Sequence, residues 1–210
     1  MYNLIDILFF AVVAFFIAIK LYSILGQKSE INKAIPIQKG LNKDDQEKEI
    51  ILNKELSDED KIKSFDSSFS KQNFINRASS AIKHIYEAYG DGDTEILSDL
   101  LNIETLRKFA YCISRIEEAD IKYSVSVVKV TNASVDATEV KNFLANIQIS
   151  SKLQLIYYLQ KDGKIIYGHK NKVEDIQLTV SYSKNLRSPD PTWKICKINY
   201  IPFQEYLKNG

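Results

Sequence analysis

The stretch Phe74–Tyr89, FINRASSAIKHIYEAY, decides the fold of this chain, and Gly90-Asp91-Gly92 follows it directly. Its apolar residues recur at helical spacing, at positions 74, 78, 81, 82, 85 and 89. This pattern predicts a long helix with one buried face, which the two glycines end. His84 lies at the edge of the apolar stripe, where a lone histidine is typical of a partly exposed structural residue rather than of a ligand.

Two shorter helices are predicted after this one, from Thr94 to Leu101 and from about Glu104 to Arg115, the second with Asn102 as its cap. After Asp120 the apolar residues alternate with polar ones, which is typical of strands. The predicted strands lie in Tyr123–Val127, Ser134–Gln148, Leu153–Leu159, Ile165–Tyr167, Ile176–Tyr182 and Trp193–Ile201, with Asp162-Gly163 as a hairpin turn. Helices first and strands after them predict an α+β fold, with the helices on one face of a curved antiparallel sheet.

The N-terminal segment Leu4–Leu25 is apolar except for Asp6, Lys20 and Ser23. As a helix, this span would be about 33 Å long, which matches the hydrocarbon core of a bilayer. It therefore predicts a transmembrane anchor over residues 1–27. A cleavable signal peptide is the competing interpretation, but nothing basic precedes the apolar run and no small-residue cleavage site follows it. The residues expected to face the lipid are Leu4, Ile7, Phe10, Val13, Phe16, Ile19, Leu21 and Leu25.

The residues after this run predict the orientation of the chain. Lys20, Lys28 and Lys33 follow the apolar run, so the positive-inside rule predicts that the N-terminus faces out and the C-terminal domain faces the cytoplasm. Residues 28–64 are rich in charge and poor in aromatic residues, which predicts a polar, flexible tether. A short partner-binding helix around Ile50–Leu52 is the alternative for part of it. The α+β domain is predicted for residues 65–210.

The composition argues against several classes of site. The net charge is +1, so no overall basic field favours nucleic acid. With only 7 Gly, the chain offers no glycine-rich phosphate loop. The 2 Cys and 2 His lack metal-ligand spacing. We therefore expect no metal, no cofactor and no direct nucleic-acid partner, and we expect both cysteines to be free thiols.

The stretch Arg187–Ile195, RSPDPTWKI, contains the only Trp of the chain. Together with SILGQK at the end of the apolar run and FDSSFSKQNFINRASSAIKHIYEAYGDGD, it resembles the bacterial branch of the Tim44-like domain family. In the family's closing pattern Ser-x-Asp-Pro-Asn-Trp-x-Leu, the matching residues are Ser188, Asp190, Pro191, Trp193 and Ile195, with Thr192 for the usual Asn. In the preceding pattern Trp-Thr-Phe-x-Arg, the residues here are Val180, Ser181, Tyr182 and Lys184.

The resemblance implies a cone of the nuclear transport factor 2-like kind that is held at a membrane and binds proteins or the membrane surface. Related proteins tether the mitochondrial import motor and hold mitochondrial ribosomes to the membrane. We accordingly expect a single-pass protein of the bacterial inner membrane whose cytoplasmic domain binds partners in protein translocation or membrane-protein assembly. A structural subunit of a membrane complex is a further alternative.

Six apolar residues are expected inside the cone: Phe74, Ile82, Tyr86, Phe109, Leu155 and Val180. They either line a groove for an apolar peptide or lipid chain, or simply fill the core. The groove interpretation leads to a second hypothesis, a lipid- or small-ligand-binding cone, with or without catalysis. Its acid–base candidates would be Asp136, Asp175 and His169, but none can be placed facing inward, so no catalytic residue is predicted.

Two further groups of residues have an expected role. Asp190, Pro191 and Trp193 are predicted to form a rigid corner that sets the register of the last strand, because the prolines fix φ and the aspartate caps its own turn. The cationic residues of the first helix, Lys71, Arg77 and Lys83, either meet anionic lipid headgroups or form an ordinary solvated face.

Overall fold

A computed structural model describes residues 56–209, so the predicted anchor and most of the predicted tether lie outside the described residues. The described part begins with the helices α3 (Asp58–Phe65), α4 (Lys71–Asp91), α5 (Thr94–Leu100) and α6 (Ile103–Glu118). The strands follow as β1 (Lys122–Lys141), β2 (Leu144–Lys161), β3 (Lys164–Gly168), β4 (Glu174–Asn185) and β5 (Lys194–Ile198), and α7 (Gln204–Asn209) comes last. None of the helices in this part of the chain is both long enough and apolar enough to span a membrane.

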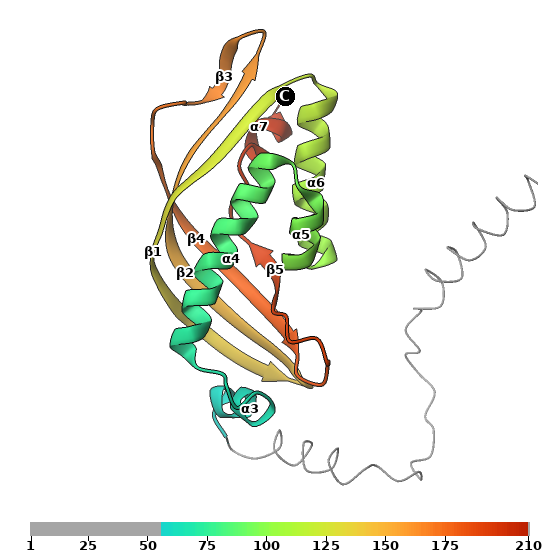
Figure 1. Ribbon diagram of the computed structural model, residues 1–210, viewed down its shortest axis with the longest axis vertical. Coiled ribbons are helices and arrows are strands. Elements are labelled where there is room, and N and C mark those ends of the chain that lie inside the picture. Colours follow the sequence, from blue (N-terminus) through green and yellow to red (C-terminus); the bar gives the residue numbers. More distant parts are fainter. Residues whose placement is uncertain (1–55, 210) are drawn as a thin grey trace, which may run out of the picture. The chain divides into compact units, whose positions relative to one another are not determined.

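Helix α4 confirms the prediction made from its apolar stripe. It begins after Ser70, whose hydroxyl accepts a hydrogen bond from the backbone N–H of Asn73, and ends at Gly92 in the left-handed conformation with φ of 70°. Its buried residues are Phe74, Ala78, Ile82, Ile85, Tyr86, Ala88 and Tyr89. His84 on the other side of the helix is exposed, as expected. Figure 1 shows α4 running along one face of the curved sheet, with α5 and α6 beside it.

The sheet is antiparallel, with the strand order β1-β2-β4-β5, and β3 pairs with the far end of β2. The predicted α+β class and curved antiparallel sheet are therefore confirmed. Along β2, alternate residues such as Ile147, Ile149 and Leu153 are buried beneath the helices. The opposite face of the central strands carries mainly serine, threonine, asparagine and glutamine. The core therefore lies on the helix side of the sheet alone.

The prediction of a separate strand over Ser134–Gln148 is wrong. That stretch contains the two-residue turn Asn142-Phe143, with φ of 47° and 65°, which joins β1 to β2. Positive φ at both positions is typical of a type I′ hairpin turn. Contacts of the Phe143 side chain stabilise this conformation. The Arg187 guanidinium lies 3.4 Å from the centroid of its ring, and the Phe65 ring packs edge-on with the two ring centroids 5.8 Å apart. The predicted strand Tyr123–Val127 forms the first part of β1.

The folded part of the chain begins before the predicted boundary between residues 64 and 65. Helix α3 starts at Asp58 and is capped by the Ser57 hydroxyl. Its first turn carries three acidic residues, whose negative charges interact favourably with the positive end of the helix dipole. Its Ile62 is 1% exposed and belongs to the core. So short a helix can dock through a single buried side chain. The rest of α3 is polar, and the sequence therefore suggested a tether.

The last strand is shorter than predicted. It ends at Ile198, and the side-chain amide of Asn199 continues the pairing by accepting from the Thr179 N–H at 2.8 Å and donating to the Gln177 carbonyl at 3.1 Å. The chain then turns into α7. The alternating apolar pattern continues through Ile201 and therefore predicted strand where the chain turns toward this helix. This C-terminal segment lies against α4 rather than continuing the sheet.

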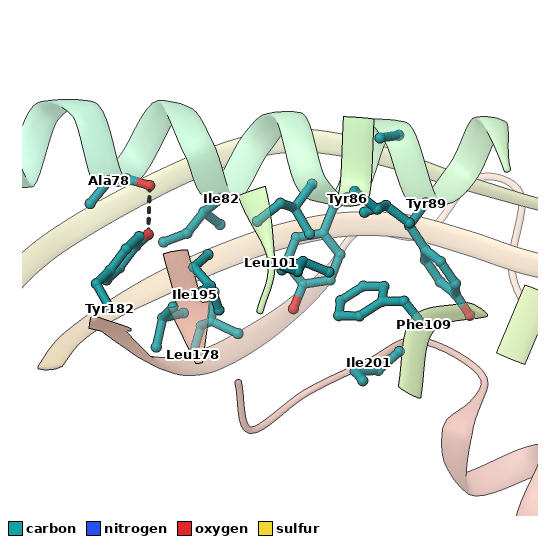
Figure 2. Close-up of a cluster of buried hydrophobic side chains, with 14 of the residues drawn as sticks. Ala78, Ile82, Tyr86, Tyr89, Leu101, Phe109, Leu178, Tyr182, Ile195 and Ile201 are labelled. Carbon is teal, nitrogen blue, oxygen red and sulfur yellow. Dashed lines mark hydrogen bonds between the residues drawn. The ribbon is translucent and has the colours of Figure 1, made fainter. Parts of the chain in front are cut away.

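Three buried tyrosine hydroxyls connect α4 to the rest of the core. Tyr86 donates to the Tyr200 carbonyl at 2.7 Å and Tyr89 donates to the Pro202 carbonyl at 2.8 Å. In the other direction, Tyr182 on β4 donates to the Ala78 carbonyl of α4 at 3.0 Å, as Figure 2 shows. Each hydroxyl thus keeps a polar group satisfied within an apolar interior.

Replacing Tyr86 with phenylalanine should lower the free energy of unfolding by about 1 to 1.5 kcal/mol, because the partly buried hydrogen bond to the Tyr200 carbonyl is lost. Urea denaturation measures the change. The matched control is Tyr111→Phe, since Tyr111 is 55% exposed and its loss should leave the midpoint unchanged. Equal midpoints for all three proteins would show that the hydroxyl contributes nothing.

The domain should lose stability above about pH 10. Burial raises the pKa of Tyr86, Tyr89 and Tyr182 in the folded protein above the ordinary tyrosine value. Above that value the unfolded chain releases these protons and the folded chain keeps them, so the stability is fully present below about pH 10 and falls as the pH rises. Denaturant unfolding across this range checks the trend. Tyr86→Phe should show a shallower fall than the unchanged protein.

Candidate functional site

A cleft of about 670 Å³ lies between the first turns of α4, the connection from α3 to α4, and the loop from β4 to β5. Five aromatic residues contribute to its wall: Phe65, Phe69, Phe74, Tyr182 and Trp193. Trp193 packs against Phe74 with ring centroids 4.9 Å apart and lies 6.3 Å from Phe69. Phe74 is buried beneath them and contacts Tyr182 edge-on at 5.4 Å. The rings of Phe69, Phe74, Tyr182 and Trp193 therefore form one connected surface, anchored to the core at Phe74.

Three charged residues lie beside these rings. The Lys184 ammonium is 3.8 Å from the Asp66 carboxylate, and the lysine side chain is only 10% exposed. The pKa of Asp66 is lowered, first by the hydrogen bond from the Ser68 hydroxyl and then by the charges of Lys184 and Arg77. Arg77 is exposed and makes no ion pair with any residue between 56 and 209. With two cations and one anion, the cleft favours an acidic group.

The stretch Arg187–Trp193 contributes Ser188, Pro189, Pro191, Thr192 and Trp193 to the wall of the cleft. The Asp190 carboxylate accepts the Thr192 N–H at 2.9 Å, and the Ser188 hydroxyl accepts the Asp190 N–H at 3.2 Å. Hydrogen bonds from Thr192 lower the pKa of Asp190, which keeps this capping group ionised. Pro189 and Pro191 each fix their own φ. The hydrogen bonds of Ser188 and Asp190 are local, as the sequence predicted for a capped turn. Sequence reasoning missed that it also borders a cleft, because the facing residues come from segments more than a hundred positions earlier.

The six residues expected inside the cone do not share one groove. Only Phe74 lines the cleft. The other five, Ile82, Tyr86, Phe109, Leu155 and Val180, have no exposed surface and pack in the main core. Figure 2 shows Ile82, Tyr86 and Phe109 among the side chains packed between α4 and the strands. Their burial supports the interpretation that they fill the core.

The acid–base candidates lie on the solvent-facing side of the domain. Asp136, His169 and Asp175 are all exposed. Asp136 accepts hydrogen bonds from Ser150 and Gln148, and Asp175 is paired with Lys152 at 2.9 Å. Within residues 56–209, no group of three or more His, Cys, Asp or Glu side chains could hold a metal ion. Cys112 is buried and Cys196 is half-buried, and both are free thiols.

Comparison with models of protein families shows which family this chain belongs to. The model of the Tim44-like domain matches residues 58–200, which include α3, the cleft and all five strands. The chain belongs to the Tim44-like domain family. The start of the match at residue 58 coincides with the first residue of α3 and agrees with the earlier domain boundary seen in the structure.

Several solved structures resemble this Tim44-like domain at low sequence identity. The intermembrane-space region of the chloroplast protein ARC6 is 17% identical with a TM-score of 0.42, and the match covers 62% of this chain and 95% of that one. The periplasmic domain of DotI is 12% identical with a TM-score of 0.40, over 64% and 96% of the two chains. An NTF2-like superfamily protein from Salmonella enterica serovar Typhimurium is 9% identical with a TM-score of 0.38, over 63% and 92%. No curated protein matches the chain in sequence.

Replacing Trp193 with alanine should lower the free energy of unfolding of the Tim44-like domain by about 2 kcal/mol, because the half-buried indole packs on Phe74 and Phe69. Chemical denaturation followed by circular dichroism measures the loss. Lys197→Ala, at an exposed position of β5, is the matched control and should change the stability by less than about 0.5 kcal/mol. A Trp193→Ala variant as stable as this control would show that the corner does not support the fold.

Proposed function

We propose that this Tim44-like domain is a protein-binding module that holds a segment of a partner protein in the cleft beside Trp193. The proposal includes a role in protein translocation or membrane-protein assembly, with the domain attached to a bacterial inner membrane by the N-terminal segment and facing the cytoplasm. The observation that carries it is the connected aromatic wall of the cleft, with cationic side chains at its edge. Membership of the family supports the same general role.

The cleft has the chemistry of a peptide-binding site. Its volume lies in the range of about 300 to 1,000 Å³ that is typical of ligand sites, and the rings of Phe65, Phe69 and Trp193 are available to an incoming apolar side chain. A few residues supply most of the binding energy in protein interfaces, and tryptophan and arginine are enriched among them. Arg77 then favours a partner segment that carries an acidic residue next to its bulky apolar one.

The same cleft is poorly suited to acid–base catalysis. Its carboxylate, Asp66, has a lowered pKa and already accepts hydrogen bonds from Ser68. A general acid or base is most effective when its pKa lies near the working pH. No histidine lines the cleft. These features favour binding over turnover.

A ligand inside the cone is less well supported than one in the cleft. Five of the six residues that would line such a cavity are fully enclosed by the core. A protein held at the membrane also has a physical reason to bind partners. The predicted anchor and tether would keep the cleft at a high effective concentration for anything that arrives at the bilayer.

The single tryptophan of the chain lines the cleft, so its fluorescence can report binding there without any added label. Peptides that combine a bulky apolar residue with an acidic one should shift the emission of Trp193 and saturate it. Arg77→Glu should weaken this binding about tenfold by reversing the charge beside the site. Lys83→Glu, a charge reversal at an exposed position of the same helix that does not line the cleft, is the control and should leave the affinity unchanged.

Crosslinking in living cells tests the class of partner. A photoreactive residue at Thr192, on the exposed edge of the cleft, should capture components of a translocation or assembly machinery, whereas one at Lys152 on the polar face of the sheet should not. Phe69→Ala should reduce the adduct from position 192. Adducts of equal yield from both positions, or adducts indifferent to Phe69→Ala, would contradict binding in the cleft.

A further inference from the structure

The aromatic rings of the cleft keep part of their surface open to a binding segment. Phe65, Phe69 and Trp193 are half-buried, whereas Phe74 beneath them is buried. Aromatic surface of this kind, gathered in one cleft, marks a site of contact with another apolar group. Arg77 at the edge of the cleft is exposed and forms no ion pair with residues 56–209. A segment that fits here therefore joins large apolar side chains to acidic ones.

The chain itself contains such a segment just before α3. The stretch Asp44–Leu52 reads DDQEKEIIL, so four acidic residues and one lysine precede three consecutive large apolar residues. It lies outside the described residues, and its sequence alone enters the argument. Its apolar run, Ile50–Leu52, is the part of the predicted tether for which a partner-binding helix was the alternative interpretation. The function proposed for the cleft leaves this run without a role.

A second apolar stretch of the predicted tether fits the cleft less well. Ile35 and Ile37 are separated by a proline and have Lys33 and Lys39 on either side. These lysines would be repelled by Arg77, whereas the acidic residues before Ile50 would be attracted by it. Of these two stretches, Asp44–Leu52 therefore has the charge that complements the cleft.

The connection to α3 is long enough for this segment to reach the cleft. Helix α3 has 8 residues and is about 12 Å long, and its last residue, Phe65, lines the cleft. The six residues from Leu52 to Asp58 can span about 20 Å when extended. The chain can therefore return along α3 from Asp58 and bring Leu52 beside Phe65. A segment attached so closely acts at an effective concentration in the millimolar range.

We infer that the segment Asp44–Leu52 binds in the cleft of its own chain and competes there with the partner segment. Its apolar run packs on the rings of Phe69 and Trp193, and its acidic residues face Arg77. This inference rests on the function proposed for the cleft, because it assigns that site an internal competitor. A partner then has to displace the segment, so weak ligands are excluded and strong ones are admitted.

The segment needs little affinity of its own to act in this way. A contact with a dissociation constant near 1 mM is enough to keep the cleft occupied for most of the time when the effective concentration is a few millimolar. The apparent affinity of an external ligand falls by the fraction of the protein whose cleft is open. Occupancy of about 80% by the segment therefore weakens external binding about fivefold.

Peptide binding to the full chain in mild detergent tests this competition, with the emission of Trp193 as the readout. The probe is a synthetic peptide of residues 44–53. Ile50→Asn together with Ile51→Asn in the chain should tighten its binding about fivefold, because the internal competitor is removed. Ile35→Asn together with Ile37→Asn is the matched control and should leave the affinity unchanged. Equal affinities for all three chains would overturn the inference.

Crosslinking locates the segment. A photoreactive residue at Asn53, next to the apolar run, should form adducts with Phe65–Lys71 or with Ser188–Lys194, which mass spectrometry identifies. Arg77→Glu should lower the yield, whereas Lys83→Glu should not. In a mixture of light and heavy isotope-labelled chains, the adducts should join residues of the same label. Adducts that join light to heavy chains, or adducts only outside the cleft, would contradict binding within one chain.

The two experiments separate failure of this inference from failure of the proposed function. Peptides that combine a bulky apolar residue with an acidic one form a second set of probes. If they bind all three chains with equal affinity and position 53 gives no adduct in the cleft, the inference fails and the proposed function stands. If no peptide shifts the emission of Trp193 in any of the chains, the cleft is not a peptide-binding site and both fail.

Discussion

The structure depends on the need to satisfy tyrosine hydroxyls inside an apolar core. Helix α4 buries Tyr86 and Tyr89 with the rest of its apolar face, and each hydroxyl requires an acceptor there. Those acceptors are carbonyls of the segment after β5, which leaves the sheet at Ile198 and lies against α4. Tyr182 makes the reciprocal bond from β4 to the first half of the helix. These bonds hold α4 to the sheet at Ala78 and to the C-terminal segment at Tyr86 and Tyr89.

Much of this arrangement could be predicted from the sequence, because local patterns govern it. The apolar stripe of α4, the cap at Asn102 and the hairpin at Asp162-Gly163 all have signals within a few residues. The turn at Asn142-Phe143 lacks such a signal. No glycine supplies its positive φ, and it is held by Phe65 and Arg187, which are distant in sequence.

The cleft was beyond prediction for the same reason. The sequence identified Trp193 and its rigid turn, but the facing rings lie in and after α3, where a charged composition concealed a packed helix. Periodicity left open whether six apolar residues line a groove or fill the core, because it reports burial and cannot distinguish a filled interior from an open site. Five of the six fill the core. A binding surface requires side chains that stay exposed despite being apolar, and only three-dimensional packing reveals those.

The irregularities of β1 have a consequence of their own. A strand of 20 residues at the edge of a sheet offers a long row of unpaired backbone groups on which another chain could add. Here the register shifts at three places, between Val127 and Lys129, between Thr131 and Ser134, and between Val135 and Ala137. Each shift bends the strand and breaks the repeat of hydrogen-bonding groups along its free edge. These shifts make the long free edge of β1 a poorer template for the addition of another strand.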